Sequence, residues 1–315
     1  MIKGRVVSGL PRYYAVTYKQ EFMFDAIGNM TRKTSTSDNP ADKLRYRNDY
    51  EYEAGTHRAK RMGDWHYRYD GNGNLVTESF GSPVTVTANN AQVHEENGVH
   101  STDYGFALTN RGAEEGGAAA AGERRDYQWN ERNLMKRSVN KTYQSEYRYG
   151  ADGQRTLKYT VSGTDRSEVR YYNRMFQVSV LNGYAAESKH IYVGETRIVT
   201  KRKDAGNTGN VSQESKLMYY YHGDHLGSAQ LVTDFEGKIY EHLEYTPYGE
   251  LWVDHAAGEV ALSPTEFRFT GKEFDKETGL YYYGARYLDP RTSRWISGDP
   301  AMGEYIPQAP INDEA

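Results

Sequence analysis

The chain has 315 residues, a net charge of −4, a mean hydropathy of −0.88 and no cysteine. The slight acidity argues against binding to nucleic acid or an anionic membrane, and the lack of cysteine excludes disulfides and thiolate sites. Tyrosine contributes 29 residues, and its ring favours strands with one buried face, so the composition predicts an all-β protein.

One motif recurs along the chain: two aromatic residues separated by one position, then Asp or Asn, then Gly or Asn three residues later. Its copies are EFMFDAIGNM (21–30), HYRYDGNGNL (66–75), DYQWNERNLM (126–135) and, without the Asp, EYRYGADGQR (146–155). Aromatics at i and i+2 share one face of a strand. Asp followed by Gly at that spacing starts a type I turn whose last residue has positive φ. Each copy therefore predicts a β-hairpin. We expect turns at 25–28, 70–73 and 130–133, and a further turn at 234–237, where Asp and Gly have the same spacing.

Consecutive hairpins of this kind must pair side by side, because one hairpin cannot bury its aromatic face alone. We therefore predict tandem β-hairpins in one long, curved antiparallel sheet. Tyr67 and Tyr69 should share a face, as should Tyr147 and Tyr149, and the rings should stack along neighbouring repeats. Three stretches without the motif read as loop insertions, at about 34–43, 112–125 and 201–216. The second, rich in Gly, Ala and charge, is expected to be the most mobile.

The most specific stretches are YYYHGDHLGSAQLVTDFEGKIYEHLEYTPYGEL (219–251) and FRFTGKEFDKETGLYYYGARYLDPRTSRWISGDP (267–300). They closely resemble the RHS repeat-associated core domain, and the upstream hairpins resemble the YD repeats that precede it. The resemblance implies a division into a YD/RHS repeat region, 1–216, and a core domain, 217–315. It also implies a β-cocoon shell, as in bacterial Rhs proteins and the C component of Tc toxins.

In that family the shell encloses a C-terminal toxin, and the core domain plugs or lines one end. The resemblance thus implies a secreted or cell-surface bacterial parent, with the enclosed toxin and a secretion-apparatus or shell-completing protein as partners. No apolar run approaches the ~18 residues that span a bilayer, and the first residues lack an apolar signal-peptide core. Neither membrane insertion nor a cofactor is expected.

The HGDHLGS stretch matches a recurrent part of the core domain at His222, Asp224, His225, Gly227 and Ser228. The structural interpretation is that Asp224 and His225 hydrogen-bond to neighbouring strands while Gly227 turns the chain. A metal site would need further ligands from His242, Glu244 or His255. The structural interpretation is favoured, because a structural zinc normally has four recognisable ligands.

Further positions match the core-domain pattern and are read as structural: Gly271, Gly279, Arg286, Asp289 and Pro290. Asp289 should start a turn with Pro290 in its second position. By the resemblance, Asp299 is one half of an autoproteolytic aspartate pair, whose second member follows about two dozen residues later in a DPxG motif. Two carboxylates that share a proton can activate water or a peptide carbonyl.

The sequence departs from this pattern at Ser293, where Gly is usual, and at Gly298, where Pro is usual. Ser293 is expected to strain a positive-φ turn by roughly 1 kcal/mol. Because the sequence stops at Ala315 before a DPxG motif, the pair is incomplete and no cleavage is expected of this chain.

The leading functional hypothesis is that the chain is a structural, encapsulating shell segment and not an enzyme. The resemblance implies self-cleavage only for a longer parent. One alternative is an aromatic-rich carbohydrate-binding or adhesin module. Another is a hydrolase that uses Asp275 and Glu277, but their hairpin turn, which ends at Gly279, predicts a solvated pair.

Overall fold

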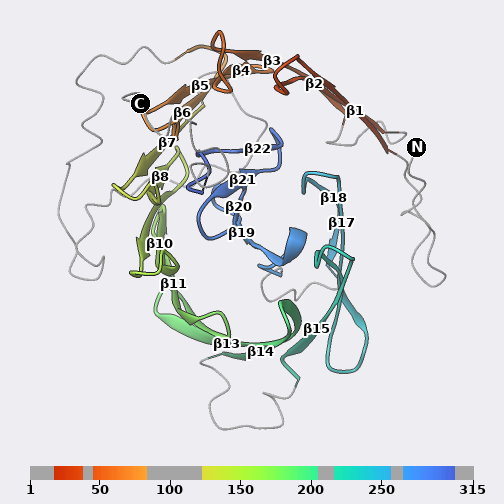
Figure 1. Ribbon diagram of the computed structural model, residues 1–315. Helices are drawn as coiled ribbons and strands as arrows, with labels where there is room; N and C mark the ends of the chain where they lie inside the picture. The colour runs from red at the N-terminus through yellow and green to blue at the C-terminus, as the bar shows by residue number, and fades with distance from the viewer. Residues whose placement is uncertain (1–17, 38–44, 84–122, 205–215, 257–264, 302–315) are drawn as a thin grey trace.

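Antiparallel strands follow one another around a ring, each hydrogen-bonded to the next along the chain (Figure 1). The structure is a computed structural model that describes residues 18–37, 45–83, 123–204, 216–256 and 265–301. Within these residues the ring has 18 strands, and a separate sheet has four. The prediction of an all-β fold of tandem hairpins in one curved antiparallel sheet is confirmed.

The first half of the ring contains β1 (Tyr18–Phe24), β2 (Met30–Ser37), β3 (Tyr46–Tyr52), β4 (Ala59–Met62), β5 (Trp65–Tyr69), β6 (Leu75–Phe80), β7 (Arg124–Trp129), β8 (Met135–Val139) and β9 (Gln144–Tyr149). The second half contains β10 (Arg155–Ser162), β11 (Asp165–Asn173), β12 (Phe176–Leu181), β13 (Tyr184–Val193), β14 (Thr196–Asp204), β15 (Met218–Gly223), β16 (Ala229–Thr233), β17 (Ile239–Tyr245) and β18 (Leu251–Ala256). In the described residues, no helix is long and apolar enough to cross a membrane.

The four predicted turns are confirmed by their hydrogen bonds. In each, the N–H of the fourth residue donates to the C=O of the first: Gly28 to Asp25 (3.2 Å), Gly73 to Asp70 (3.1 Å), Asn133 to Asn130 (3.0 Å) and Gly237 to Asp234 (3.1 Å). The fourth residues have φ of 87°, 81°, 55° and 79°. Asparagine at position 133 serves because its side chain tolerates the left-handed region.

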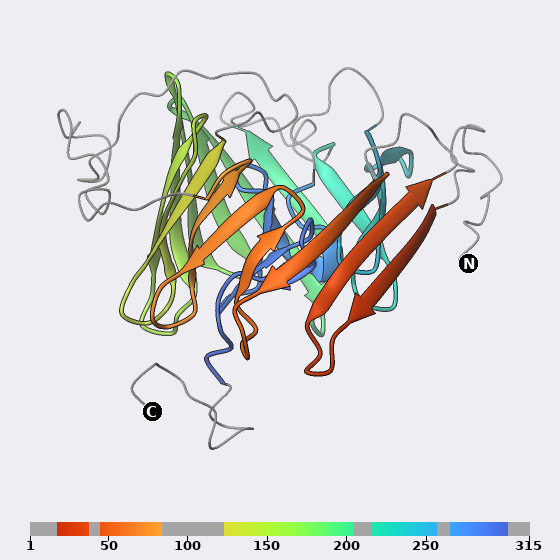
Figure 2. The same ribbon diagram turned by 90° about the horizontal axis from the view of Figure 1, so that it is seen from above.

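The four-stranded sheet lies inside the ring (Figures 1 and 2). It consists of β19 (Glu273–Asp275), β20 (Leu280–Tyr282), β21 (Tyr287–Asp289) and β22 (Arg294–Trp295), preceded by the short 3-10 helix η4 (Phe269–Gly271). The strands of 218–256 continue the ring wall. Within the described residues, the change from ring to inner sheet therefore comes after β18.

The ring's tyrosines pack against this inner sheet. Tyr67 and Tyr147 are buried and belong to one core with Leu280 and Tyr287, against which Tyr69 and Tyr149 also pack. The predicted shared faces are therefore confirmed. The centroid of the Tyr147 ring lies 6.2 Å from that of Tyr287, a contact with the inner sheet that the expectation of stacking between neighbouring repeats did not anticipate.

The predicted loop insertions are wrong at their edges. Strand β2 extends to Ser37, β7 begins at Arg124, and β14 extends to Asp204. Residues at the start of the first and third insertions and at the end of the second are therefore strand residues. The reason is that hydrogen bonding to the neighbouring strand sets the length of each strand here, and the intrinsic strand preference of the residues does not reveal that pairing. Residues 38–44, 84–122 and 205–215 lie outside the described part, and with them most of the segment expected to be mobile.

Candidate functional site

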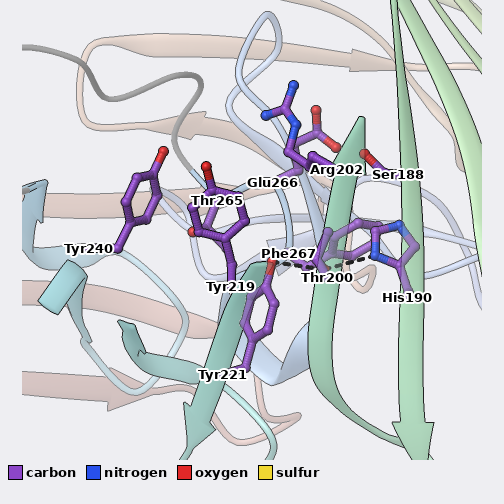
Figure 3. A pocket seen from close by; sticks show the side chains of 10 residues that line it. All are labelled: Ser188, His190, Thr200, Arg202, Tyr219, Tyr221, Tyr240, Thr265, Glu266 and Phe267. Atoms are coloured by element: carbon purple, nitrogen blue, oxygen red, sulfur yellow. Dashed lines mark hydrogen bonds between the residues drawn. The ribbon is translucent and has the colours of Figure 1, made fainter. Parts of the chain in front are cut away.

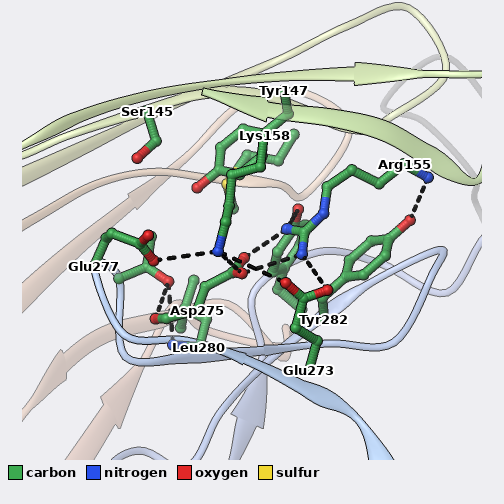
Figure 4. Close-up of polar contacts among 12 residues, drawn as sticks. Ser145, Tyr147, Arg155, Lys158, Glu273, Asp275, Glu277, Leu280 and Tyr282 are labelled. Atoms are coloured by element: carbon green, nitrogen blue, oxygen red, sulfur yellow. Dashed lines mark hydrogen bonds and ion pairs between the residues drawn. The ribbon is translucent and has the colours of Figure 1, made fainter. Parts of the chain in front are cut away.

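A buried cluster of ionised side chains joins the inner sheet to the ring wall (Figure 4). Asp275, at the end of β19, accepts hydrogen bonds from Arg155 Nη1 at 2.6 Å and Nη2 at 3.1 Å, and from Lys158 Nζ at 2.8 Å. Glu273 lies 2.8 Å from Arg155 Nη2. Both cations come from β10, so the strand after the fourth repeat holds the inner sheet.

The expectation that Asp275 and Glu277 form a solvated pair is wrong. Asp275 is 0% exposed, and Glu277 lies 3.5 Å from Lys158 Nζ with only 12% of its side chain exposed. The hairpin turn itself is present: Gly279 has φ of 73° and its N–H donates to the C=O of Asp275 at 2.8 Å. Turn residues are usually exposed, but this turn lies within the ring, where the wall supplies its counter-ions.

The electrostatics of the cluster favour its charged state. Burial by itself raises the pKa of Asp275, but the charges of Arg155 and Lys158 outweigh burial and hold this pKa below its ordinary value. Burial lowers the pKa of Lys158, and the attraction of Asp275 reverses the effect, so that its pKa lies above the ordinary value. The Arg155 guanidinium also lies 4.2 Å from the centroid of the Tyr282 ring, a cation–π contact. The cluster thus anchors the inner sheet to the wall through the ion pairs of Arg155 and Lys158 with Asp275 and Glu273.

A second buried cluster anchors the other end of the inner sheet. Arg291 Nη2 donates to Glu78 Oε2 at 3.2 Å and to Asp289 Oδ2 at 2.9 Å. Glu78 is 0% exposed and also accepts from Tyr127 Oη at 2.6 Å. As predicted, Asp289 starts a turn, since its Oδ1 accepts the N–H of Arg291 at 2.9 Å.

The HGDHLGS turn connects β15 to β16 and touches the segment that leads into the inner sheet. Asp224 Oδ1 accepts the N–H groups of Leu226 at 2.9 Å and Ser228 at 2.8 Å. Gly227 has φ of 80°, so it turns the chain as expected. Asp224 therefore closes its own turn. The expectation that its carboxylate would bond to a neighbouring strand is not met by these two hydrogen bonds, which lie within the turn.

Ser228 and Gly271 make the contact with the inner segment. The buried hydroxyl of Ser228 accepts the N–H of Thr270 at 3.0 Å. Gly271 has φ of 68°, and a Cβ there would lie 3.4 Å from the carbonyl oxygen of Gly227. The motif thus docks the η4 segment against the wall.

The histidines of this stretch are dispersed. His222 Nε2 lies 3.2 Å from Thr233 Oγ1, and His225 is exposed. His242 Nε2 lies 3.2 Å from Glu244 Oε1. Among the described residues no three His, Cys, Asp or Glu side chains gather in an arrangement that could hold a metal ion.

A small polar cavity of about 30 Å³ lies between the wall and the start of the inner segment (Figure 3). Its lining includes His190, Thr200, Tyr221 and Glu266. His190 Nδ1 lies 2.9 Å from Thr200 Oγ1, and burial, with a contribution from Arg197, lowers the pKa of His190 to about 3. The imidazole is therefore neutral. The space suits about one or two water molecules, which makes it part of the packing between wall and inner segment.

Asp299 follows the inner sheet and pairs with a residue of the same segment. Its Oδ2 lies 2.9 Å from Arg286 Nη2, and its Oδ1 accepts the N–H of Ala301 at 3.0 Å. The Arg286 guanidinium in turn lies 4.2 Å from the centroid of the Trp295 ring. Arg286 and Asp299, singled out separately in the sequence, are thus brought together, and Asp299 is held in one orientation.

Ser293 has φ of 60°, which confirms the expected left-handed turn between β21 and β22. We expect Ser293→Gly to raise the free energy of unfolding by about 1 kcal/mol, because a left-handed conformation strains a residue with a Cβ by about that amount. Chemical denaturation measures the change. The same substitution at Ser297, which is buried and outside the positive-φ set, should lower stability; a gain at both positions would contradict the argument.

Sequence reasoning missed the residues that bind the two sheets together: Arg155, Lys158, Glu273, Glu78, Arg291, Lys33 and Glu250. Lys33 is 0% exposed and its Nζ lies 2.6 Å from Glu250 Oε2. The one available signal was the place of Arg155 and Lys158 on β10, the strand that also carries the buried Tyr159. That signal is weak, because a polar residue in a strand usually faces solvent.

Comparisons with known proteins agree with this architecture. A family model described as Teneurin YD-shell matches residues 14–312. The tRNA3(Ser)-specific nuclease WapA of Bacillus spizizenii is 28% identical over 246 residues, which cover 75% of this chain and 10% of that protein. Toxin subunit YenC1 of Yersinia entomophaga is 32% identical over 169 residues, 49% of this chain and 16% of that protein.

Among solved structures, the crystal structure of TcdB2-TccC3 is similar in fold. The TM-score is 0.64 at 23% sequence identity, over 94% of this chain and 13% of that one. The chain therefore corresponds to a small part of each of these three proteins.

Proposed function

Because this chain belongs to the Teneurin YD-shell family, we propose that it is a wall segment of an RHS shell that encloses and delivers a C-terminal toxin. The family and the fold account for the wall. The enclosing role is supported by one observation: the last described segment lies inside the ring and is ion-paired to it at Asp275 and at Arg291. A chain that continues from an anchored inner sheet is well placed to be enclosed.

The proposal includes no enzymatic activity of the chain alone. Asp299 acts in self-cleavage only where a second aspartate completes the pair, and Arg286 holds its carboxylate in place at 2.9 Å. The parent is proposed to be a secreted or surface-exposed bacterial protein, with the enclosed toxin and a shell-completing protein as its partners. The toxin subunit YenC1 and the nuclease WapA among the similar proteins support this.

The test uses a version extended through a DPxG motif and the domain that follows. We expect the extended protein to separate into two polypeptides that still elute together, with the second polypeptide resistant to protease until the shell is denatured. Asp299→Asn should abolish cleavage and leave protease resistance intact, since an amide keeps the shape of the carboxylate but cannot transfer the proton.

Asp152→Asn, at an exposed turn, is the matched control and should cleave normally. Protease sensitivity of the second polypeptide in the native state would contradict enclosure. Normal cleavage of Asp299→Asn would leave Asp299 as a turn residue, because Asn starts turns nearly as well as Asp.

Carbohydrate binding is the second candidate, supported by the exposed rings of Tyr172 (61%) and Tyr184 (79%). Such rings can stack on sugars. Binding on a glycan array that disappears in Tyr184→Ala would favour an adhesin. The buried tyrosines, which pack against the inner sheet, favour the shell.

A further inference from the structure

The two ends of the ring meet without a backbone ladder. Strand β1 pairs with β2, and β18 pairs with β17. Within the described residues no strand pairing joins β1 to β18, although the two lie at adjacent ends of the ring (Figure 1). Around the rest of the ring, each described strand is hydrogen-bonded to the next. The junction between β1 and β18 therefore differs from every other junction in the described ring.

Among the described residues, side-chain contacts connect the two ends. Three contacts follow one another in antiparallel order, each two positions further along one chain segment and two positions back along the other. They are Tyr18 with Trp252 (ring centroids 4.6 Å apart), Gln20 Nε2 with Glu250 Oε2 (3.3 Å) and Phe22 with Tyr248 (ring centroids 5.4 Å apart). We call these six residues the seam.

Glu250 is the centre of the seam. One of its oxygens, Oε2, accepts hydrogen bonds from Lys33 Nζ at 2.6 Å, from Tyr46 Oη at 2.5 Å and from Gln20 Nε2 at 3.3 Å. The three donors come from β2, β3 and β1. A single carboxylate from one end of the ring thus holds three strands of the other end.

The partner of Glu250 is a buried cation. The Lys33 side chain is 0% exposed and that of Glu250 is 13% exposed. Lys33 Nζ also lies 3.4 Å from the carbonyl oxygens of Pro290 and Arg291, both in the inner segment. An ammonium in this position needs a counter-ion, so removal of Glu250 acts on the wall and on the inner segment together.

We propose that the seam is a latched lateral opening of the ring, with the Glu250–Lys33 pair as the latch. To part the wall between other neighbouring strands, paired backbone positions must separate, from two between β4 and β5 to eight between β13 and β14, and backbone groups are costly to leave unpaired. Parting at the seam breaks two aromatic contacts and the hydrogen bonds of one carboxylate. The wall therefore opens first between β1 and β18, where an extended polypeptide can pass sideways.

Hydrogen–deuterium exchange of this chain tests the proposal. In Glu250→Ala, amides of β1 and β18 should exchange at least ~10-fold faster than in wild type, while peptides from β10 to β13 keep their wild-type rates. Glu195→Ala is the control, because the side chain of Glu195 is 91% exposed and far from the seam in the chain. Unchanged exchange at β1 and β18 would overturn the proposal, as would a uniform increase in all peptides.

A cross-link separates opening from a local effect of the substitution. The chain has no cysteine, so Lys19→Cys together with Val253→Cys allows specific bridging of the two ends by a flexible bis-maleimide. In the Glu250→Ala variant the bridge should restore slow exchange of the β1 and β18 amides. In the protein that keeps Glu250, the bridge should slow exchange of β1 and β18 but not of the other strands. Fast exchange that persists after bridging would overturn the latch.

If Glu250→Ala does not fold, Lys33→Met with Glu250→Gln removes both charges while it preserves their approximate shapes. The same selective increase in exchange at β1 and β18 is expected in this double variant. Wild-type rates there would refute the role of the ion pair, because the other contacts of the seam would then hold the two ends together without it.

Discussion

Asp275→Asn is expected to lower the free energy of unfolding by about 3 to 5 kcal/mol, the usual cost of removing one partner from a buried ion pair. The variant leaves the positive charges of Arg155 and Lys158 inside the ring with one counter-ion fewer. Glu273 and Glu277 compensate in part, since they lie 2.8 Å from Arg155 and 3.5 Å from Lys158. Urea unfolding followed by tyrosine fluorescence measures the loss.

Asp152→Asn is the matched control, because Asp152 is exposed and its recorded partner is a backbone N–H in its own turn. We expect its stability to change by less than about 0.5 kcal/mol. If the two variants lost equal stability, the Asp275 cluster would contribute no more than a surface charge.

The effect of Asp275 should depend on pH in one direction. Its pKa in the folded protein is lower than in the unfolded chain, chiefly because the charges of Arg155 and Lys158 outweigh the effect of burial. Stabilisation by such a group is complete above its unfolded pKa of about 3.9 and is lost as the pH falls through the lower, folded pKa. The stability difference between wild type and Asp275→Asn should therefore be constant from about pH 6 to 8 and shrink below about pH 4.

Tyr147→Ala is the second change with a large expected effect. The Tyr147 side chain is 3% exposed, its hydroxyl lies 3.0 Å from Ser138 Oγ, and its ring packs against Tyr287 of the inner sheet. Truncation of a buried ring to Ala removes transfer free energy and leaves a cavity, which together cost about 3 to 5 kcal/mol. Thermal and urea unfolding should both show the loss.

Tyr184→Ala serves as the control, because Tyr184 belongs to the same kind of strand but is 79% exposed. Its replacement should change stability by less than about 0.5 kcal/mol. A loss below half a kcal/mol in Tyr147→Ala would mean that the ring is not packed between the wall and the inner sheet.

Local conformation was determined by the sequence alone. A turn at Asp25, Asp70, Asn130 or Asp234 is specified within four residues, because the side chain of the first residue and the positive φ of the fourth act over that distance. Ser293 belongs to the same class: its positive φ was expected from one departure from a pattern. Because such hairpins follow one another along the chain, the sequence also predicted a single antiparallel sheet.

Only the tertiary structure decided which charged residues are buried. Asp275 has the sequence signature of an exposed turn, yet its partner Arg155 lies 120 positions earlier in the chain. Lys33 and Glu250 are 217 positions apart and meet because the ring brings its two ends together. The turn pattern carries no information about what lies opposite it, whereas the ion pairs depend on ring closure and on the inner sheet, which are properties of the whole chain.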